Sequence, residues 1–185
     1  MPLRGRDSLT EERYFFVTST VVRFINIFSD PNICNILINE IRFYQAKYKF
    51  TILAYVIMPS HFHWIIEVNP EFGTISDIMR DLKGHSSKVI MEYLCERKDL
   101  QDIFRFEAAL KRDQKRKLWM DSFDDQVIRN EKMFWTKLKY IHQNPVEAGL
   151  VLRDYEYQYS SARNYYLKDH SVIFVDTTQG GVILL

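Results

Sequence analysis

The sequence predicts an α+β fold in which helices pack on a ferredoxin-like antiparallel sheet. Expected elements follow the order strand, helix, strand, strand, helix, strand, with one further helix, and this order is that of the ferredoxin-like motif. Of the 185 residues, 46% are hydrophobic and 15% are aromatic, which is enough to build a core. Because strands and helices are mixed, we expect a layered architecture with the helices covering one face of the sheet.

The first half of the chain contains three expected strands and a helix. Residues 13–22 (RYFFVTSTVV) are aromatic and β-branched, which predicts a strand. Apolar residues recur at helical spacing after Pro31, so we expect a helix from there to residue 48. Residues 49–58 and 62–68 read as two strands of a hairpin, separated by Pro59 and Ser60.

The second half contains two more expected helices and weaker strand signals. Gly73 and Thr74 precede a helical pattern that continues to residue 97, with Gly84 as a weak point. Residues 118–120 and 172–175 are candidate short strands, the latter at an edge of the sheet. The third main helix is expected over 128–142 and is expected to stop at Asn144–Pro145. We divide the chain into an N-terminal arm (1–12), a main domain (13–152) and a Tyr-rich C-terminal extension (153–185).

The charge and the cysteine content limit the classes of protein to which this chain can belong. Lys and Arg number 25 and Asp and Glu 24, a net charge of +1, so any nucleic-acid-binding surface must be local. Cys34 and Cys95 are too few for a disulfide framework, and we expect both to be reduced. No apolar signal core follows the N-terminus and no run is long enough to span a membrane. We therefore expect a cytoplasmic protein.

His61 and His63 lie where the second strand of the hairpin begins. Strand residues i and i+2 point to the same face, so both imidazoles project together, with Phe62 on the opposite, core side. Two such imidazoles form half of a divalent-metal site. A solvated or hydrogen-bonded pair is the alternative that this spacing leaves open.

Tyr140 and Asn144 form a second candidate pair at the end of the third helix. A spacing of four residues places both on one helix face, and an amide oxygen is a suitable ligand for a hard metal ion. The alternative is that Asn144–Pro145 only ends the helix and that Tyr140 packs in the core. His142 would point elsewhere and is interpreted as structural or on the surface.

These residues also belong to a longer resemblance. Residues 55–63 (YVIMPSHFH) resemble the AYVIMPNHVH signature of the single-tyrosine HUH transposases, in particular the REP-associated tyrosine transposase branch. Residues 118–119 (LW), 128–131 (IRNE), 140–151 (YIHQNPVEAGLV) and 159–162 (YSSA) match the same family in the same order, so the resemblance extends over 13–166. Ser60 replaces the usual Asn, and a net charge of +1 is low for such proteins.

The resemblance implies an HUH nuclease fold and assigns a role to each candidate. His61, His63 and Asn144 would hold a divalent metal, Mg²⁺ or Mn²⁺, and Tyr140 would be the nucleophile. It implies metal-dependent cleavage of single-stranded DNA and strand transfer through a 5′-phosphotyrosine, acting on hairpin, REP-like DNA in transposition. A bound metal would polarise the phosphate, and the covalent phosphotyrosine would keep the bond energy, so no nucleotide cofactor is needed. Whether the protein is a monomer or a homodimer stays open.

Residues that would contact DNA are a separate prediction. Residues 97–117 contain eight Lys or Arg and four Asp or Glu, a local charge of +4, which would neutralise phosphates or would simply be a solvated face. Lys83 is expected to face the site from the second helix. The basic candidates are Lys83, Arg97, Lys98, Arg105, Lys111, Arg112, Lys115, Arg116 and Lys117. For the tyrosines after residue 153 packing is favoured over base stacking, and for Asp124 and Asp125 a helix N-cap is favoured over metal binding.

Two other functions are compatible with the same residues. The first is a module that holds hairpin DNA or RNA without cutting it. The second is a metal hydrolase that acts on a small phosphodiester, with Tyr140 only structural. Metal-dependent formation of a covalent protein–DNA adduct distinguishes the transposase interpretation from both.

Overall fold

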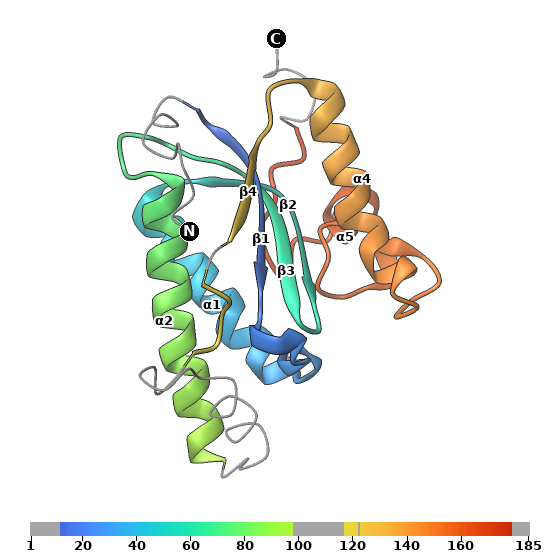
Figure 1. Cartoon of the computed structure of the whole chain (residues 1–185). Coiled ribbons are helices and arrows are strands. Elements are labelled where there is room, and N and C mark those ends of the chain that lie inside the picture. The colour runs from blue at the N-terminus through green and yellow to red at the C-terminus, as the bar shows by residue number, and fades with distance from the viewer. Residues whose placement is uncertain (1–11, 98–116, 122, 179–185) are drawn as a thin grey trace.

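A four-stranded antiparallel sheet forms the centre of the protein in this computed structural model, which describes residues 12–97, 117–121 and 123–178 (Figure 1). The strand order is β2-β3-β1-β4. The strands are β1 (Tyr14–Thr20), β2 (Thr51–Met58), β3 (His61–Glu67) and β4 (Asp124–Val127). The α+β class and the ferredoxin-like element order predicted from the sequence are confirmed.

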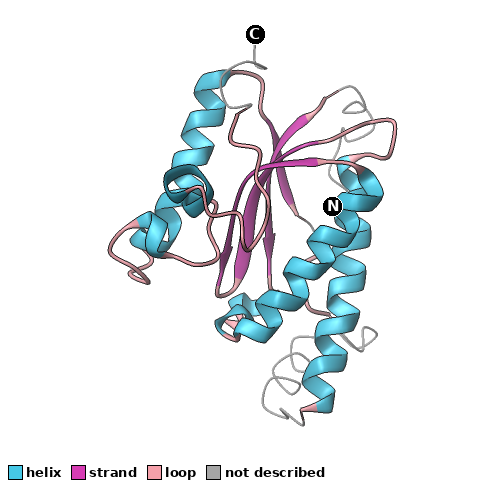
Figure 2. Cartoon of the chain, turned by 180° about the vertical axis from the view of Figure 1, so that it is seen from behind, coloured by secondary structure: helices cyan, strands magenta, loops and turns pink. Residues whose placement is uncertain are grey.

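Helices cover both faces of the sheet, so the expectation of a single covered face was wrong. The helices α1 (Pro31–Tyr48) and α2 (Ile75–Glu96) pack against one face, whereas α4 (Glu131–Glu147) and the short α5 (Ala162–Leu167) lie on the other. Figures 1 and 2 show the two helical layers on opposite sides of the strands. Three 3₁₀ turns complete the described elements: η2 (Val22–Phe24), η3 (Ile27–Ser29) and η4 (Asp154–Glu156).

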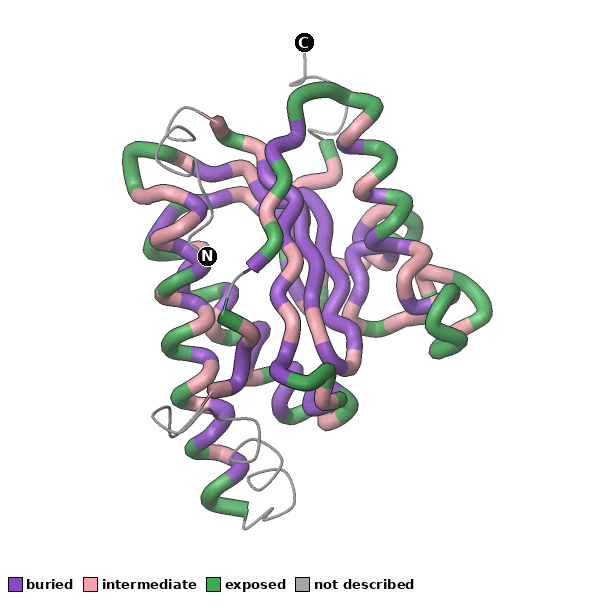
Figure 3. Tube along the Cα trace, viewed as in Figure 1, coloured by how far each residue is buried: buried purple, intermediate pink, exposed green. Residues whose placement is uncertain are grey.

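Two hydrophobic cores result, because alternate residues of each strand face opposite layers. In β3, Phe62, Trp64 and Ile66 pack into the core under α1 and α2. Ile65 packs into the second core with Leu138 and other α4 residues. Figure 3 shows that the central strands are buried along most of their length. The face toward α4 is the one on which the two histidines of β3 lie.

Helix starts were predictable where the N-cap is local in sequence. Asp30 caps α1 by accepting a hydrogen bond from the backbone N–H of Asn32 at 2.8 Å. Thr74 caps α2 in a capping box with Asp77. Both starts agree with the sequence pattern, and α2 continues through Gly84 without interruption.

The region around β4 differs from expectation. Asp124 and Asp125 are strand residues and not a helix N-cap, because they pair with the free edge of β1. The helix begins instead at Glu131, after Asn130, whose side chain accepts from the backbone N–H of Met133 at 2.9 Å. Trp119 forms only an isolated β-bridge and not the predicted strand.

Two further expectations about the C-terminal half were wrong. Helix α4 continues through Pro145 to Glu147, because Pro145 is buried in the last turn and its packing overrides the local preference to stop. The predicted strand at 172–175 is irregular, although Ile173 and Val175 are buried and the N–H of Asp176 donates to the carbonyl of Ile52 at 3.0 Å. Among the described residues, no helix is both long and apolar enough to cross a membrane.

Candidate active site

His61 and His63 project together from β3 toward α4, as the i, i+2 spacing predicts. Their ring centroids are 4.8 Å apart and the rings are inclined at 74°. His63 is buried, with only 4% of its surface exposed, and His61 is half-buried. Phe62, between them, points into the opposite core. The two imidazoles therefore form a pair on one sheet face.

A hydroxyl group lies within hydrogen-bonding distance of the Nδ1 atom of each histidine. Thr18 lies directly opposite His63 in the β1–β3 pair, and its Oγ1 is 2.8 Å from His63 Nδ1. Ser60 Oγ lies 3.2 Å from His61 Nδ1. A metal-binding histidine usually donates its second ring N–H to an oxygen of this kind, which fixes the tautomer and the ring orientation. With Nδ1 engaged, the Nε2 atom of each ring is the one that would bind a metal.

Tyr140 reaches the histidine pair from α4. Its Oη lies 3.4 Å from His63 Nε2, and the two ring centroids are 5.1 Å apart. Phe16 of β1 stacks on His63 at 5.6 Å and contacts Tyr140 edge to face at 5.9 Å. Tyr140 keeps 42% of its surface exposed. Its hydroxyl is thus held at the histidines while remaining accessible to a substrate.

Burial keeps both imidazoles neutral. It lowers the pKa of His63 to about 3, and the neighbouring charges of His61 and Lys137 act in the same direction. Burial also lowers the pKa of His61. A neutral imidazole retains the lone pair that a metal ligand needs. At neutral pH both rings are therefore in the form that binds a cation.

The chemistry of these donors fits a divalent metal. Two neutral imidazoles lie on β3, and the amide of Asn144 is one helical turn beyond Tyr140 on α4. Mg²⁺ and Mn²⁺ accept oxygen ligands, and imidazole is also a ligand for first-row metals such as Mn²⁺. Within the described ranges no three His, Cys, Asp or Glu side chains cluster as a metal site. The third ligand that the family resemblance implies is the amide of Asn144.

Three residues near the site were missed by sequence reasoning. They are Phe16 and Thr18 on β1, and Lys137, whose Nζ lies 4.4 Å from the centroid of the Phe16 ring. Lys137 precedes Tyr140 by three residues, a helical spacing that would have revealed it. No sequence signal identifies Thr18, because its position depends on how β1 pairs with β3.

The predicted basic residues that the structure describes lie away from the histidine pair or are already engaged. Lys83 lies on α2, on the opposite face of the sheet, and its Nζ donates to the carbonyl of Met120 at 2.8 Å, so the expectation that it faces the site was wrong. Arg97 forms an ion pair with Asp30 at 3.0 Å, and Lys117 forms one with Asp121. Lys98, Arg105, Lys111, Arg112, Lys115 and Arg116 lie outside the described residues.

Two tyrosines of the C-terminal extension, Tyr157 and Tyr165, serve for packing, as expected, whereas Tyr166 is exposed. Tyr157 and Tyr165 donate hydrogen bonds at 2.9 Å to the carbonyls of Ile57 and Leu53 in β2. His142 is buried, and its Nε2 is 2.9 Å from Ser161 Oγ, which agrees with a structural role. These contacts attach the described part of the extension to the sheet.

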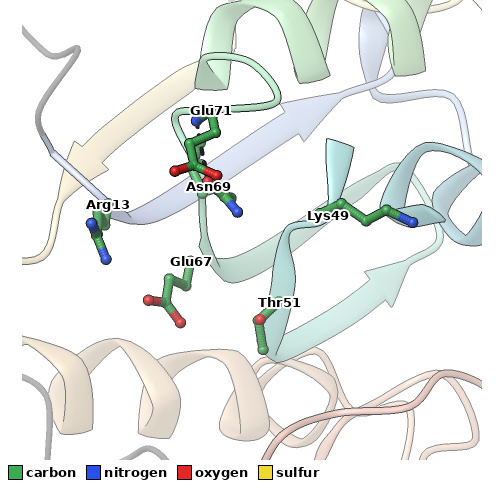
Figure 4. A pocket seen from close by; sticks show the side chains of 7 residues that line it. Arg13, Lys49, Thr51, Glu67, Asn69 and Glu71 are labelled. Atoms are coloured by element: carbon green, nitrogen blue, oxygen red, sulfur yellow. Dashed lines mark hydrogen bonds between the residues drawn. The ribbon is translucent and has the colours of Figure 1, made fainter. Parts of the chain in front are cut away.

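A polar pocket of about 300 Å³ lies at the other end of β3 (Figure 4). Arg13 and Lys49 contribute positive charge, and Glu67 and Glu71 contribute negative charge. Glu67 ends β3, whereas His61 begins it, so this pocket is separate from the histidine pair. Its balanced charge gives it no preference for phosphate.

Most of the chain is similar to a known protein family. A family model described as "Transposase IS200 like" matches residues 11–144, which include His61, His63 and Tyr140. A search of curated proteins found no match.

A solved structure shows a similar fold. A REP-associated tyrosine transposase bound to a REP hairpin superposes with a TM-score of 0.63 at 20% identity, over 90% of this chain and 88% of that one. A candidate transposase from Deinococcus radiodurans R1 superposes with a TM-score of 0.46 at 15% identity, over 75% of this chain and 95% of that one. The family model confirms the resemblance to the transposase family, and the REP-associated tyrosine transposase structure confirms the fold predicted from the sequence.

Proposed function

The chain belongs to the IS200-like transposase family, and on this basis we propose that it cleaves single-stranded DNA beside a folded hairpin and transfers the strand through a 5′-phosphotyrosine at Tyr140. The observation that carries the proposal is the position of the Tyr140 hydroxyl, 3.4 Å from Nε2 of His63. The proposed nucleophile therefore lies beside the two imidazoles that we propose as metal ligands. The solved relative of similar fold is bound to a REP hairpin, which supports the choice of substrate.

In the proposed reaction Tyr140 Oη attacks the scissile phosphorus in line with the leaving 3′ oxygen. The new bond joins Oη to phosphorus while the bond from phosphorus to the 3′ oxygen breaks. The phenol loses its proton and the departing oxygen gains one, so the products are a 5′-phosphotyrosine and a free 3′-hydroxyl. A second 3′-hydroxyl reverses these steps and joins two strands without a nucleotide cofactor.

The residues around Tyr140 prepare this attack. Phe16 packs against both Tyr140 and His63 and limits the movement of the phenol. Lys137 is close enough to this cluster for its charge to act on His63 and, as we propose, on the bound phosphate. A divalent cation held by His61, His63 and Asn144 would supply polarisation of the phosphate.

Covalent trapping tests the proposal. The protein is incubated with single-stranded hairpin oligonucleotides from the flanks of its own gene, with Mn²⁺ or with chelator, and run on a denaturing gel. We expect a shifted protein–DNA band that requires metal and is absent in Tyr140→Phe. The matched control is Tyr93→Phe, because Tyr93 lies on α2, on the other side of the sheet. Retention of the adduct in Tyr140→Phe would exclude Tyr140 as the nucleophile.

A further inference from the structure

A second pocket lies on the side of α4 that faces α5. Its volume is about 510 Å³. The residues that line it include Trp135, Lys139, His142 and Gln143 of α4, together with Tyr165 and Tyr166 of α5. The pocket is therefore built on the helix that carries Tyr140.

The pocket has a rigid base and an exposed aromatic rim. At the base, His142 and Tyr165 pack edge to face with centroids 5.3 Å apart, and each is hydrogen-bonded to a buried neighbour. At the rim, Trp135 exposes 44% of its surface and Tyr166 exposes 61%. A hydrogen bond of 2.9 Å from Trp135 Nε1 to Glu131 Oε1 orients the indole. Flat apolar surfaces held in place at an open rim suit a planar ligand.

Polar groups surround the same opening. Gln143 Nε2 donates to Asp154 Oδ2 at 3.2 Å, so an amide oxygen and a carboxylate are both present in the lining. The carboxylate and the amide offer acceptors for the amino groups of a base. Lys139 adds a positive charge that balances the Asp154 carboxylate. The combination of an exposed aromatic rim with hydrogen-bond acceptors suits an unpaired base better than a simple apolar ligand.

We propose that this pocket binds an unpaired base of the DNA strand whose phosphate is attacked by Tyr140. The proposal rests on the function proposed above and specifies how the single-stranded part of the substrate is held. Lys139 is adjacent to Tyr140 in sequence, and Gln143 is three residues beyond it. Since a helix with its side chains is about 10–12 Å across, a strand of a few nucleotides spans from the pocket to the Tyr140 hydroxyl. In this proposal the base contacts the exposed rings of Trp135 and Tyr166.

Fluorescence titration measures this binding directly. The probe is a DNA hairpin with single-stranded extensions, taken from the flanks of the protein's own gene and titrated in EDTA so that no cleavage occurs. Trp64 and Trp119 are buried, with 0% and 4% exposure, so quenching of tryptophan emission reports on Trp135. We expect quenching by this probe, and none by the same hairpin without extensions.

Affinity measurements on variants complete the test. Trp135→Ala and Tyr166→Ala are each expected to weaken binding of the extended hairpin by about 5- to 150-fold, the range for loss of one base–aromatic stack. Trp135→Phe should stay close to wild type because a ring remains. Phe43→Ala, which removes an exposed ring from α1 on the other face, should leave the affinity unchanged.

Abasic substitutions locate the bound base. Removal of the base at one position of the extension is expected to weaken binding to the wild-type protein. The same removal should have no further effect on binding to Tyr166→Ala. If both alanine variants bind the extended hairpin as well as wild type does, the pocket assignment is wrong while cleavage by Tyr140 is unaffected. If the variants weaken binding but the wild type forms no covalent adduct, the pocket stands and the proposed cleavage fails. Absence of DNA binding by the wild type would overturn both.

Discussion

The hydroxyl of Thr18 lies 2.8 Å from Nδ1 of His63, across the β1–β3 pair. This contact fixes the ring so that Nε2 points toward Tyr140, which is 3.4 Å away. A partner of this kind orients a metal ligand without contacting the metal itself. Substitution of Thr18 therefore tests the metal site through metal affinity, without a cleavage assay.

Thr18→Val is expected to weaken Mn²⁺ binding by about 10- to 100-fold, the usual effect of losing a partner that orients a ligand. The substitution keeps the shape of the side chain and removes the hydrogen bond. Isothermal titration calorimetry of the DNA-free protein measures the affinity. Thr136→Val, at an exposed position on α4, is the matched control. Equal affinities for Thr18→Val and wild type would show that this hydroxyl does not position His63 for a metal.

Asn144 is the proposed third ligand, and two substitutions distinguish an oxygen donor from a structural role. Asn144→Ala is expected to lower Mn²⁺ affinity and adduct formation by at least about tenfold, because no oxygen remains. Asn144→Asp keeps an oxygen of the same reach and is expected to retain both. Calorimetry gives the affinity, and far-ultraviolet circular dichroism of the whole protein controls for folding. If Asn144→Ala and Asn144→Asp have the same Mn²⁺ affinity, Asn144 does not act as a ligand.

Lys137 is expected to contact a phosphate of the bound strand. Loss of one phosphate contact on single-stranded DNA lowers the slope of log K against log salt concentration by about 0.7. Lys137→Gln should therefore bind the extended hairpin more weakly at low salt and with a slope reduced by this amount. The control is Lys88→Gln, an exposed position on α2 across the sheet. An unchanged slope in Lys137→Gln would place the phosphate elsewhere.

Stability at low pH is expected to depend on Asp81, which joins α1 to α2. Asp81 accepts from Lys47 Nζ at 2.7 Å and from Tyr48 Oη at 2.6 Å, and these bonds lower the pKa of its carboxyl to about 2. An unfolded Asp has a pKa of about 3.9, so the stabilisation is present above that pH and is lost as the pH falls toward 2.

Asp81→Asn is therefore expected to lower the free energy of unfolding by about 1–2 kcal/mol at pH 7. The same variant should lose less stability than wild type between about pH 4 and pH 2, since it has no carboxyl to protonate. Urea unfolding at a series of pH values measures both effects. Glu92→Gln, exposed on the same helix, serves as the control. A wild-type pH profile in Asp81→Asn would disprove the assignment.

Sequence reasoning succeeded where a structure depends on neighbouring residues. The caps at Asp30 and Thr74 lie beside the helices that they start. Strand alternation placed His61 and His63 on one face, because the period of two holds in any strand. The same reasoning failed for β4, since its sequence, DDQV, has little strand preference. Those residues become a strand because the edge of β1 is available for pairing.

By itself, therefore, the sequence determined the order of the first three strands and the main helices, the paired direction of His61 and His63, and a helix carrying Tyr140. Only the tertiary structure decided which residues meet. Thr18 and His63 are 45 residues apart, and His63 and Tyr140 are 77 apart. No local rule specifies such contacts. They follow from burial of two apolar sheet faces, which requires α1 and α2 to cover one face and leaves the other, with both histidines, to α4.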